Sequence, residues 1–168
     1  MKRALFLMCF VIFALSSCES PGATSPWKLM KLYNGKPNIT VVNLGDSAHG
    51  HGDGMAWEAP LRDTLGNIVG EAMGWTVTVD IMDGDSANPI FLTERNGVSI
   101  LNFGDENEII GQGITSYYNG EKRLKLGLSQ IYPIVGGTGK YKGVQGEYSV
   151  TRQPDSTYVY LLSIKMQN

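Results

Sequence analysis

Cysteine is nearly absent from this sequence, which contains only Cys9 and Cys18 among its 168 residues. Cys9 lies inside an N-terminal apolar run that we expect to be removed on export, so one cysteine remains. A single cysteine cannot form a disulfide within the chain, and this excludes the staples typical of small secreted domains. The stability of the chain must therefore come from a packed core, and about 150 mature residues are enough for one domain.

Long apolar runs are also scarce. The longest covers residues 4–15 (ALFLMCFVIFAL) and follows a basic start, Met1-Lys2-Arg3. This length suits a signal peptide and is shorter than the roughly 20 residues that span a bilayer. Residues 15–18 (LSSC) resemble the lipobox of bacterial lipoproteins, in which the cysteine is acylated and becomes the first mature residue. An ordinary signal peptide with an incidental cysteine is the alternative.

We therefore predict a signal peptide over residues 1–17, with Cys18 as the lipidation site and the membrane as its partner. Residues 18–37 are expected to form the lipidated tether and an N-terminal arm, and residues 38–168 the folded domain. Within the arm, residues 27–33 (WKLMKLY) fit either a short helix or a packed segment. Glu19 rather than Asp follows the cysteine, which favours a lipid-anchored location in the cell envelope, in the outer membrane facing the periplasm.

Basic residues are too few to suggest a nucleic-acid partner. The chain has 14 basic and 16 acidic residues, a formal net charge of −2. Loss of Lys2 and Arg3 with the signal peptide makes the mature chain more acidic still. This balance excludes nucleic acid and electrostatic binding to anionic lipid as main functions.

Helical periodicity is missing after residue 38, and the chain contains 21 glycines. Runs of β-branched and aromatic residues alternate with turn signals instead, a pattern typical of antiparallel strands. The expected strands cover residues 39–44, 54–62, 67–82, 98–105, 109–118, 123–135, 143–152 and 157–165. The expected turns are Asn34-Gly35, Asp83-Gly84, Asn96-Gly97, Asn119-Gly120 and residues 136–139. Eight such strands predict an all-β, eight-stranded antiparallel up-and-down barrel, because closure removes free edges, and an open β-sandwich is the alternative.

Three stretches of the chain carry a family resemblance. Residues 135–146 (VGGTGKYKGVQG) resemble the Gly-Gly-Thr-Gly signature of allene oxide cyclases, dirigent proteins and their bacterial barrel relatives. Residues 103–113, with Phe-Gly-Asp and a later Gln-Gly, and residues 52–74 are similar to two further strand pairs of that family. The resemblance implies an allene oxide cyclase-like barrel with a mostly apolar cavity, assembled as a homodimer or homotrimer.

The resemblance leaves three functions open. The barrel could bind a small hydrophobic molecule without chemistry, act on it as a cyclase, isomerase or dirigent-like enzyme, or serve as a structural or interaction protein of the envelope. The first expected strand carries no acidic residue, unlike the family's cyclases. If the strand parity follows the family, residues 70, 72, 74, 76 and 78 face inward, and Trp75 and Val77 face outward. The predicted cavity-lining residues are Trp57, Thr76, Asn102, Gln112 and Tyr132.

Histidine is as scarce as cysteine, and both histidines, His49 and His51, lie in one glycine-rich segment. They are weak candidates for a metal site, because the sequence places no third strong ligand beside them. Residues 136–140 are similar to a phosphate-binding loop, but a strand rather than a helix is expected to follow. We therefore expect no metal and no cofactor.

Overall fold

The structure is a computed structural model, and it describes residues 27–44, 50–82, 92–118 and 121–167. Its strands are β1 (Lys28–Asn34), β2 (Asn38–Val42), β3 (Gly54–Arg62), β4 (Ile68–Met82), β5 (Leu92–Asn102), β6 (Glu108–Tyr118), β7 (Ser129–Gly137), β8 (Gln145–Arg152) and β9 (Tyr158–Lys165), with a short 3-10 helix, η1 (Gly139–Tyr141). All pairings between these strands are antiparallel. The predicted signal peptide and Cys18 lie outside the described residues.

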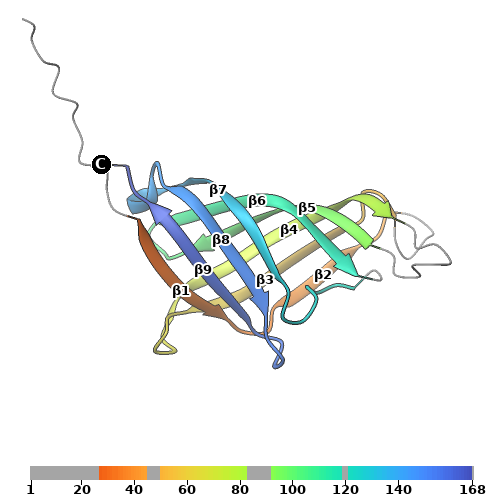
Figure 1. Ribbon diagram of the computed structural model, residues 1–168, viewed down its shortest axis with the longest axis horizontal. Helices are drawn as coiled ribbons and strands as arrows, with labels where there is room; N and C mark the ends of the chain where they lie inside the picture. The colour runs from red at the N-terminus through yellow and green to blue at the C-terminus, as the bar shows by residue number, and fades with distance from the viewer. Residues whose placement is uncertain (1–26, 45–49, 83–91, 119–120, 168) are drawn as a thin grey trace, which may run out of the picture.

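The strands close into a barrel (Figure 1). Consecutive strands from β3 to β9 pair side by side, β9 pairs with β1, and β1 returns to β3. β2 also pairs with β3, further along the same edge, so β1 and β2 together occupy one strand position of the barrel. With β3 to β9 the barrel has eight strand positions, and the predicted eight-stranded antiparallel barrel is confirmed. Closure supplies partners to the edge strands that an open sandwich would leave exposed.

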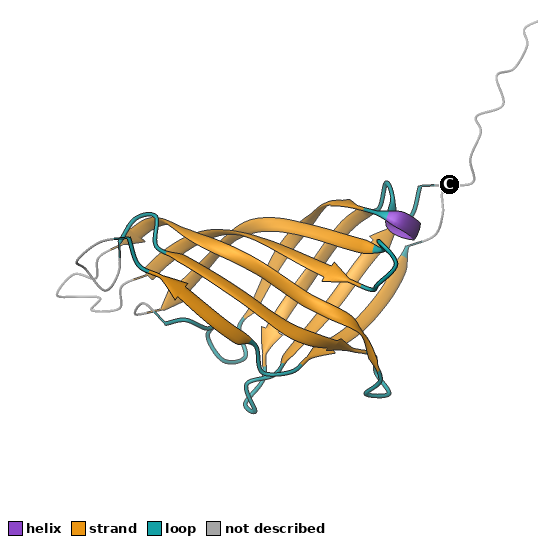
Figure 2. Ribbon diagram, turned by 180° about the vertical axis from the view of Figure 1, so that it is seen from behind, coloured by secondary structure: helices purple, strands orange, loops and turns teal. Residues whose placement is uncertain are grey.

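Side chains alternate between the barrel interior and its outer face, as period-2 strands require. On β4, Ala72, Thr76 and Thr78 are buried, whereas Trp75 and Val77 are exposed. This agrees with the inward and outward parity that we predicted for the strand. Figure 2 shows how fully strands dominate the fold, with η1 as a small cap at one end of the barrel.

The apolar core fills the end of the barrel at which β4, β6 and β8 begin. Ala72, Leu101, Ile109 and Ile164 are completely buried there, and Tyr141 of η1 packs beside them. Burying each Leu or Ile side chain contributes roughly 1.5–3 kcal/mol relative to exposure. This end is therefore closed, and any internal space must lie toward the other end.

Several predicted boundaries are wrong. Residues 27–33 do not form a helix, because residues 28–34 are strand β1, whose partner β9 is distant in sequence. The barrel therefore starts before the predicted boundary at residue 38. Asn96-Gly97 is not a turn but lies inside β5, while β7 begins at Ser129 and continues to Gly137.

The turn at Asn34-Gly35 separates β1 from β2 as predicted, whereas Asp83-Gly84 and Asn119-Gly120 lie outside the described residues. Across the described part of the chain, no helix is long and apolar enough to cross a membrane.

Candidate ligand cavity

A cavity of about 60 Å³ lies inside the barrel, between the apolar core and the loop that joins β6 to β7. A single water needs about 10–15 Å³ on this scale, so the space suits a few waters or a small group of a larger molecule. Its wall is unusually rich in tyrosine, with five of the chain's eight: Tyr117, Tyr132, Tyr148, Tyr158 and Tyr160.

Glycines of the nearby strand β6 make room for these aromatic rings. A Cβ atom on Gly111 would lie 2.3 Å from the Tyr148 ring, and one on Gly113 would lie 3.1 Å from Tyr132. The Tyr132 and Tyr148 rings stack with their centroids 5.3 Å apart, within the usual range of aromatic pairs. Gly111 and Gly113 thus shape the cavity wall.

The tyrosine hydroxyls are held by short polar side chains. The Tyr148 hydroxyl is hydrogen-bonded to Ser99 Oγ, and the Tyr132 hydroxyl to Thr115 Oγ1. These contacts fix both rings, because each buried hydroxyl has its partner inside the barrel.

Two other buried polar atoms on the cavity wall have no hydrogen-bond partner among the described residues. They are Asn34 Oδ1 and Thr76 Oγ1, on β1 and β4. The Asn34 amide is oriented by its other end, because Nδ2 donates to Tyr160 Oη at 3.1 Å. Leaving a buried polar atom unpaired costs about 1–3 kcal/mol. A ligand or water that offers a donor to Asn34 and a polar group to Thr76 would recover that cost.

Burial keeps the phenols of the cavity protonated. It raises the pKa of Tyr117, Tyr148 and Tyr160 well above the ordinary value, and the neighbouring phenols raise it further. The pKa of Tyr132 is raised by burial as well, although its hydrogen bond to Thr115 opposes the shift. These side chains can donate hydrogen bonds at neutral pH but cannot act as bases.

The raised pKa values predict alkaline unfolding. Above pH 10, the ordinary tyrosine pKa, the unfolded chain loses phenolic protons that the folded chain retains, so stability falls as pH rises. Each such tyrosine contributes a slope of about 1.4 kcal/mol per pH unit. We expect phenolate absorbance near 295 nm to appear together with the loss of circular dichroism.

In the Tyr160→Phe variant the free energy of unfolding should fall less steeply between pH 10 and 12, because unfolding then releases about one proton fewer. Ordinary titration of the cavity tyrosines near pH 10 in a chain that stays folded would contradict the buried cluster.

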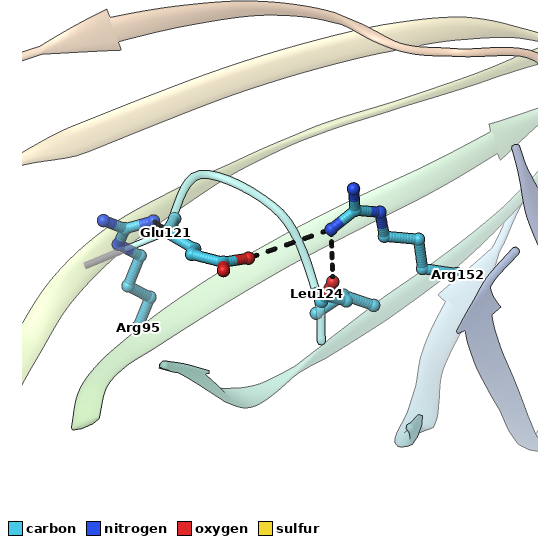
Figure 3. A network of polar contacts seen from close by, with 4 residues as sticks. All are labelled: Arg95, Glu121, Leu124 and Arg152. Carbon is cyan, nitrogen blue, oxygen red and sulfur yellow. Dashed lines mark hydrogen bonds and ion pairs between the residues drawn. The ribbon is translucent and has the colours of Figure 1, made fainter. Parts of the chain in front are cut away.

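Charged residues surround the mouth of the cavity. Lys122 and Arg123, in the loop between β6 and β7, line its opening. The same loop is held by two arginines from the barrel wall, Arg95 on β5 and Arg152 on β8 (Figure 3). Burial lowers the pKa of Arg95, while the charge of Asp53 opposes that shift. An arginine keeps its charge even so, and the mouth therefore has a cationic character.

The structure brings three of the predicted lining residues together at the cavity: Trp57, Thr76 and Tyr132. The prediction is wrong for the other two. Asn102 and Gln112 occupy the outward-facing parity of β5 and β6, so Gln112 is exposed and Asn102 bonds to Gly104 N and Glu108 at the strand end. A one-residue error in parity is enough to move a side chain to the other face.

Sequence reasoning missed the most polar parts of the site. Asn34 and Arg95 lay in segments that were not expected to be strands, so their inward parity was not visible. The alternation of Tyr158 and Tyr160 with smaller residues could have indicated an aromatic wall. His51 is exposed on a turn, and His49 lies outside the described residues. Among the described residues, no three metal-ligating side chains come together.

No protein-family model and no curated protein sequence matches this chain. Solved structures do match. A pyocyanin demethylase is 19% identical, with a TM-score of 0.58, covering 83% of this chain and 99% of its own. A Diels-Alderase from Streptomyces koyangensis is 17% identical, with a TM-score of 0.61, over 85% of this chain and 69% of its own. A pterocarpan synthase dirigent protein is 14% identical, with a TM-score of 0.54, over 92% and 99%.

At these identities the matches establish the fold and leave the activity open. They include a dirigent protein, a member of one of the groups named in the sequence resemblance. The chain therefore shares its barrel fold with these solved structures.

Proposed function

We propose that the barrel binds a small hydrophobic molecule and acts on it as a cyclase-, isomerase- or dirigent-like enzyme. The observation that carries this proposal is the aromatic cavity with unpartnered polar atoms at Asn34 and Thr76. Pockets that bind small molecules combine such apolar walls with a few polar groups that fix orientation. The proteins of similar fold include a Diels-Alderase and a pterocarpan synthase dirigent protein, which supports this class of reaction.

The proposed chemistry is positioning. Rigid rings such as Trp57 and Tyr148 would hold a flexible substrate in one folded conformation, which converts an improbable encounter into an intramolecular step. The hydroxyl of Thr76 could donate a hydrogen bond to an oxygen that gains negative charge as bonds rearrange. Fixed donors of this kind act without taking up a proton.

A binding protein without chemistry is the second candidate, and one observation favours it. The described residues that line the cavity include no Asp, Glu or His, so an ordinary general base is missing from the wall. Reactions that need proton abstraction are therefore less suited to this site than pericyclic or conformation-controlled ones.

We also propose that the barrel is a lipoprotein of the cell envelope, tethered through Cys18. This proposal rests on the N-terminal sequence pattern alone. β1 begins at the end of the barrel that carries η1, whereas the loop between β6 and β7, whose residues line the cavity mouth, lies at the other end (Figure 1). A membrane tether at that end would direct the mouth away from the lipid.

Native mass spectrometry of the purified chain tests ligand binding. We expect an additional mass that is released on denaturation and identified in the organic extract. In the Thr76→Val variant the bound fraction should fall by about tenfold, because one polar contact is lost while the cavity volume is kept. The substitution should also stabilise the empty protein by about 1 kcal/mol, since it removes an unpaired buried hydroxyl.

Thr115→Val is the matched control. It removes a hydroxyl that does have a partner, on Tyr132, so it should destabilise the protein by about 1 kcal/mol. Absence of any bound mass from repeated preparations, with equal unfolding midpoints for the two variants, would argue for a barrel filled only by its own side chains.

A further inference from the structure

We propose that Arg95 and Arg152, which hold the loop at the cavity mouth, recognise the carboxylate of an amphipathic ligand whose apolar body enters the barrel. This inference rests on the proposed function and narrows it to a class of substrate. It is carried by Arg95, a buried cation whose hydrogen-bond acceptors are neutral, and by Arg152, a cation whose ion-pair partner, the Glu121 carboxylate, can be replaced by a ligand.

Arg95 is a charged residue placed deep in the barrel wall, with 7% of its surface exposed. Its Nε donates to Thr78 Oγ1 at 3.3 Å and its Nη1 to the Glu121 carbonyl at 3.4 Å. The Tyr117 ring covers the guanidinium at 4.5 Å. These partners are neutral and the two hydrogen bonds are long, whereas a charge-assisted bond to an anion is shorter and about twice as strong.

Asp53 is the carboxylate whose charge acts on Arg95 within the barrel. It is buried as well, and it accepts hydrogen bonds from the amides of Leu44 and Gly50 at 2.8 Å each. Asp53 thus binds the backbone at Leu44 and Gly50 while it helps to offset the cost of burying Arg95.

Arg152 holds the same loop from β8 and lies on the other side of Glu121 from Arg95 (Figure 3). Its Nη1 donates to the Leu124 carbonyl at 3.1 Å and lies 3.8 Å from a carboxylate oxygen of Glu121. Its Nε is buried and has no hydrogen-bond partner among the described residues. The Glu121 side chain is 56% exposed, and an ion pair this long and exposed contributes little. A ligand carboxylate could take the place of the Glu121 side chain.

Two further cations strengthen the local field. Lys122 and Arg123 line the cavity opening beside these arginines. Four positive groups therefore gather around the mouth of a chain whose formal net charge is −2. A concave site of one sign attracts ions of the other sign and orients them as they enter.

The cavity continues directly from this cationic group. Tyr117 and Met55 both contact Arg95, and both also line the cavity. A carboxylate bound at Arg95 would therefore place the attached apolar body against the tyrosine wall, within reach of Thr76. This arrangement defines a ligand with one anionic end and one small apolar or aromatic end.

The test compares an acid with its neutral amide on the full folded chain. Benzoate, 3-phenylpropionate and 1-naphthaleneacetate would be titrated beside their amides, with binding followed by nuclear magnetic resonance. We expect at least one acid to bind about tenfold tighter than its amide. Arg152→Gln should abolish this preference, and Glu121→Gln should strengthen acid binding, because it removes the competing carboxylate.

Arg62→Gln serves as the control, since Arg62 lies on β3 and donates to Gly66 at the other end of the barrel. Arg95→Gln should also reduce the preference for the acid over its amide. This variant is compared only if its circular dichroism spectrum matches that of the parent chain. Equal binding of acids and amides would overturn this inference and leave the proposed function standing. Failure of every acid to bind, while native mass spectrometry still finds a neutral bound molecule, would also overturn it.

Discussion

Replacing Gly146 with alanine should unfold the barrel under conditions in which the parent chain is stable. Gly146 has φ of +139°, a backbone conformation that residues with a Cβ rarely adopt. A Cβ atom there would lie 2.0 Å from the Ser163 carbonyl oxygen of the neighbouring strand. The clash is with backbone, so relief requires β8 and β9 to separate. β9 is also the strand that pairs with β1 to close the ring.

We expect the free energy of unfolding of Gly146→Ala to fall by about 3–5 kcal/mol, a large part of the 5–15 kcal/mol typical of a domain. Urea denaturation followed by tryptophan fluorescence measures this loss. Gly136→Ala is the matched control, because no atom lies within 4 Å of the position of its Cβ. Alanine there should change stability by less than about 1 kcal/mol. Similar midpoints for the two variants would contradict the close strand approach at Gly146.

The barrel itself could be predicted because its signals are local and repeated. Turn residues, alternating strands and the Gly-Gly-Thr-Gly segment each indicate the same architecture. β1 was the exception, because its lysines at 28 and 31 and its apolar residues fit a helical spacing as well as a strand. Its strand conformation depends on pairing with β9, which no local pattern reveals.

Asn96-Gly97 was mistaken for a turn for a related reason. This dipeptide is a strong hairpin signal when the strands on either side pair with each other. In the structure it lies across from Thr76 and Val77 of β4, and a Cβ on Gly97 would meet Thr76 Cγ2 at 2.7 Å. The glycine serves a close approach between strands, a demand that only the folded chain imposes.

The candidate site was harder to predict than the fold. Trp57, Thr76 and Tyr132 could be chosen because strand parity places them inward. Asn102 and Gln112 show how a shift of one residue reverses that choice. Arg95 could not be predicted as a site residue, because charged residues are rarely buried inside a barrel. Its burial depends on Tyr117 and on the loop that covers it.

Replacing Cys18 with serine should release the protein from the membrane completely. Lipidation requires the cysteine thiol, and residues 1–17 would lose the processing site that the lipobox supplies. Acyl chains provide firm anchoring only through the apolar area that they bury in the bilayer. We expect the parent chain in the membrane fraction with incorporated radiolabelled palmitate, and Cys18→Ser in the soluble exported fraction without palmitate.

Cys9→Ser is the matched control, since it changes the only other cysteine and leaves the lipobox intact. It should be lipidated and fractionate like the parent chain. The cavity gives a second, independent check on the same variants. The described barrel starts at Trp27 and Lys28, at the end remote from the mouth, so the released Cys18→Ser domain should unfold at the same urea concentration and bind the same ligand. Membrane association that persists in Cys18→Ser would show that the barrel is held by something other than lipid, and the orientation proposed for its mouth would then have no basis.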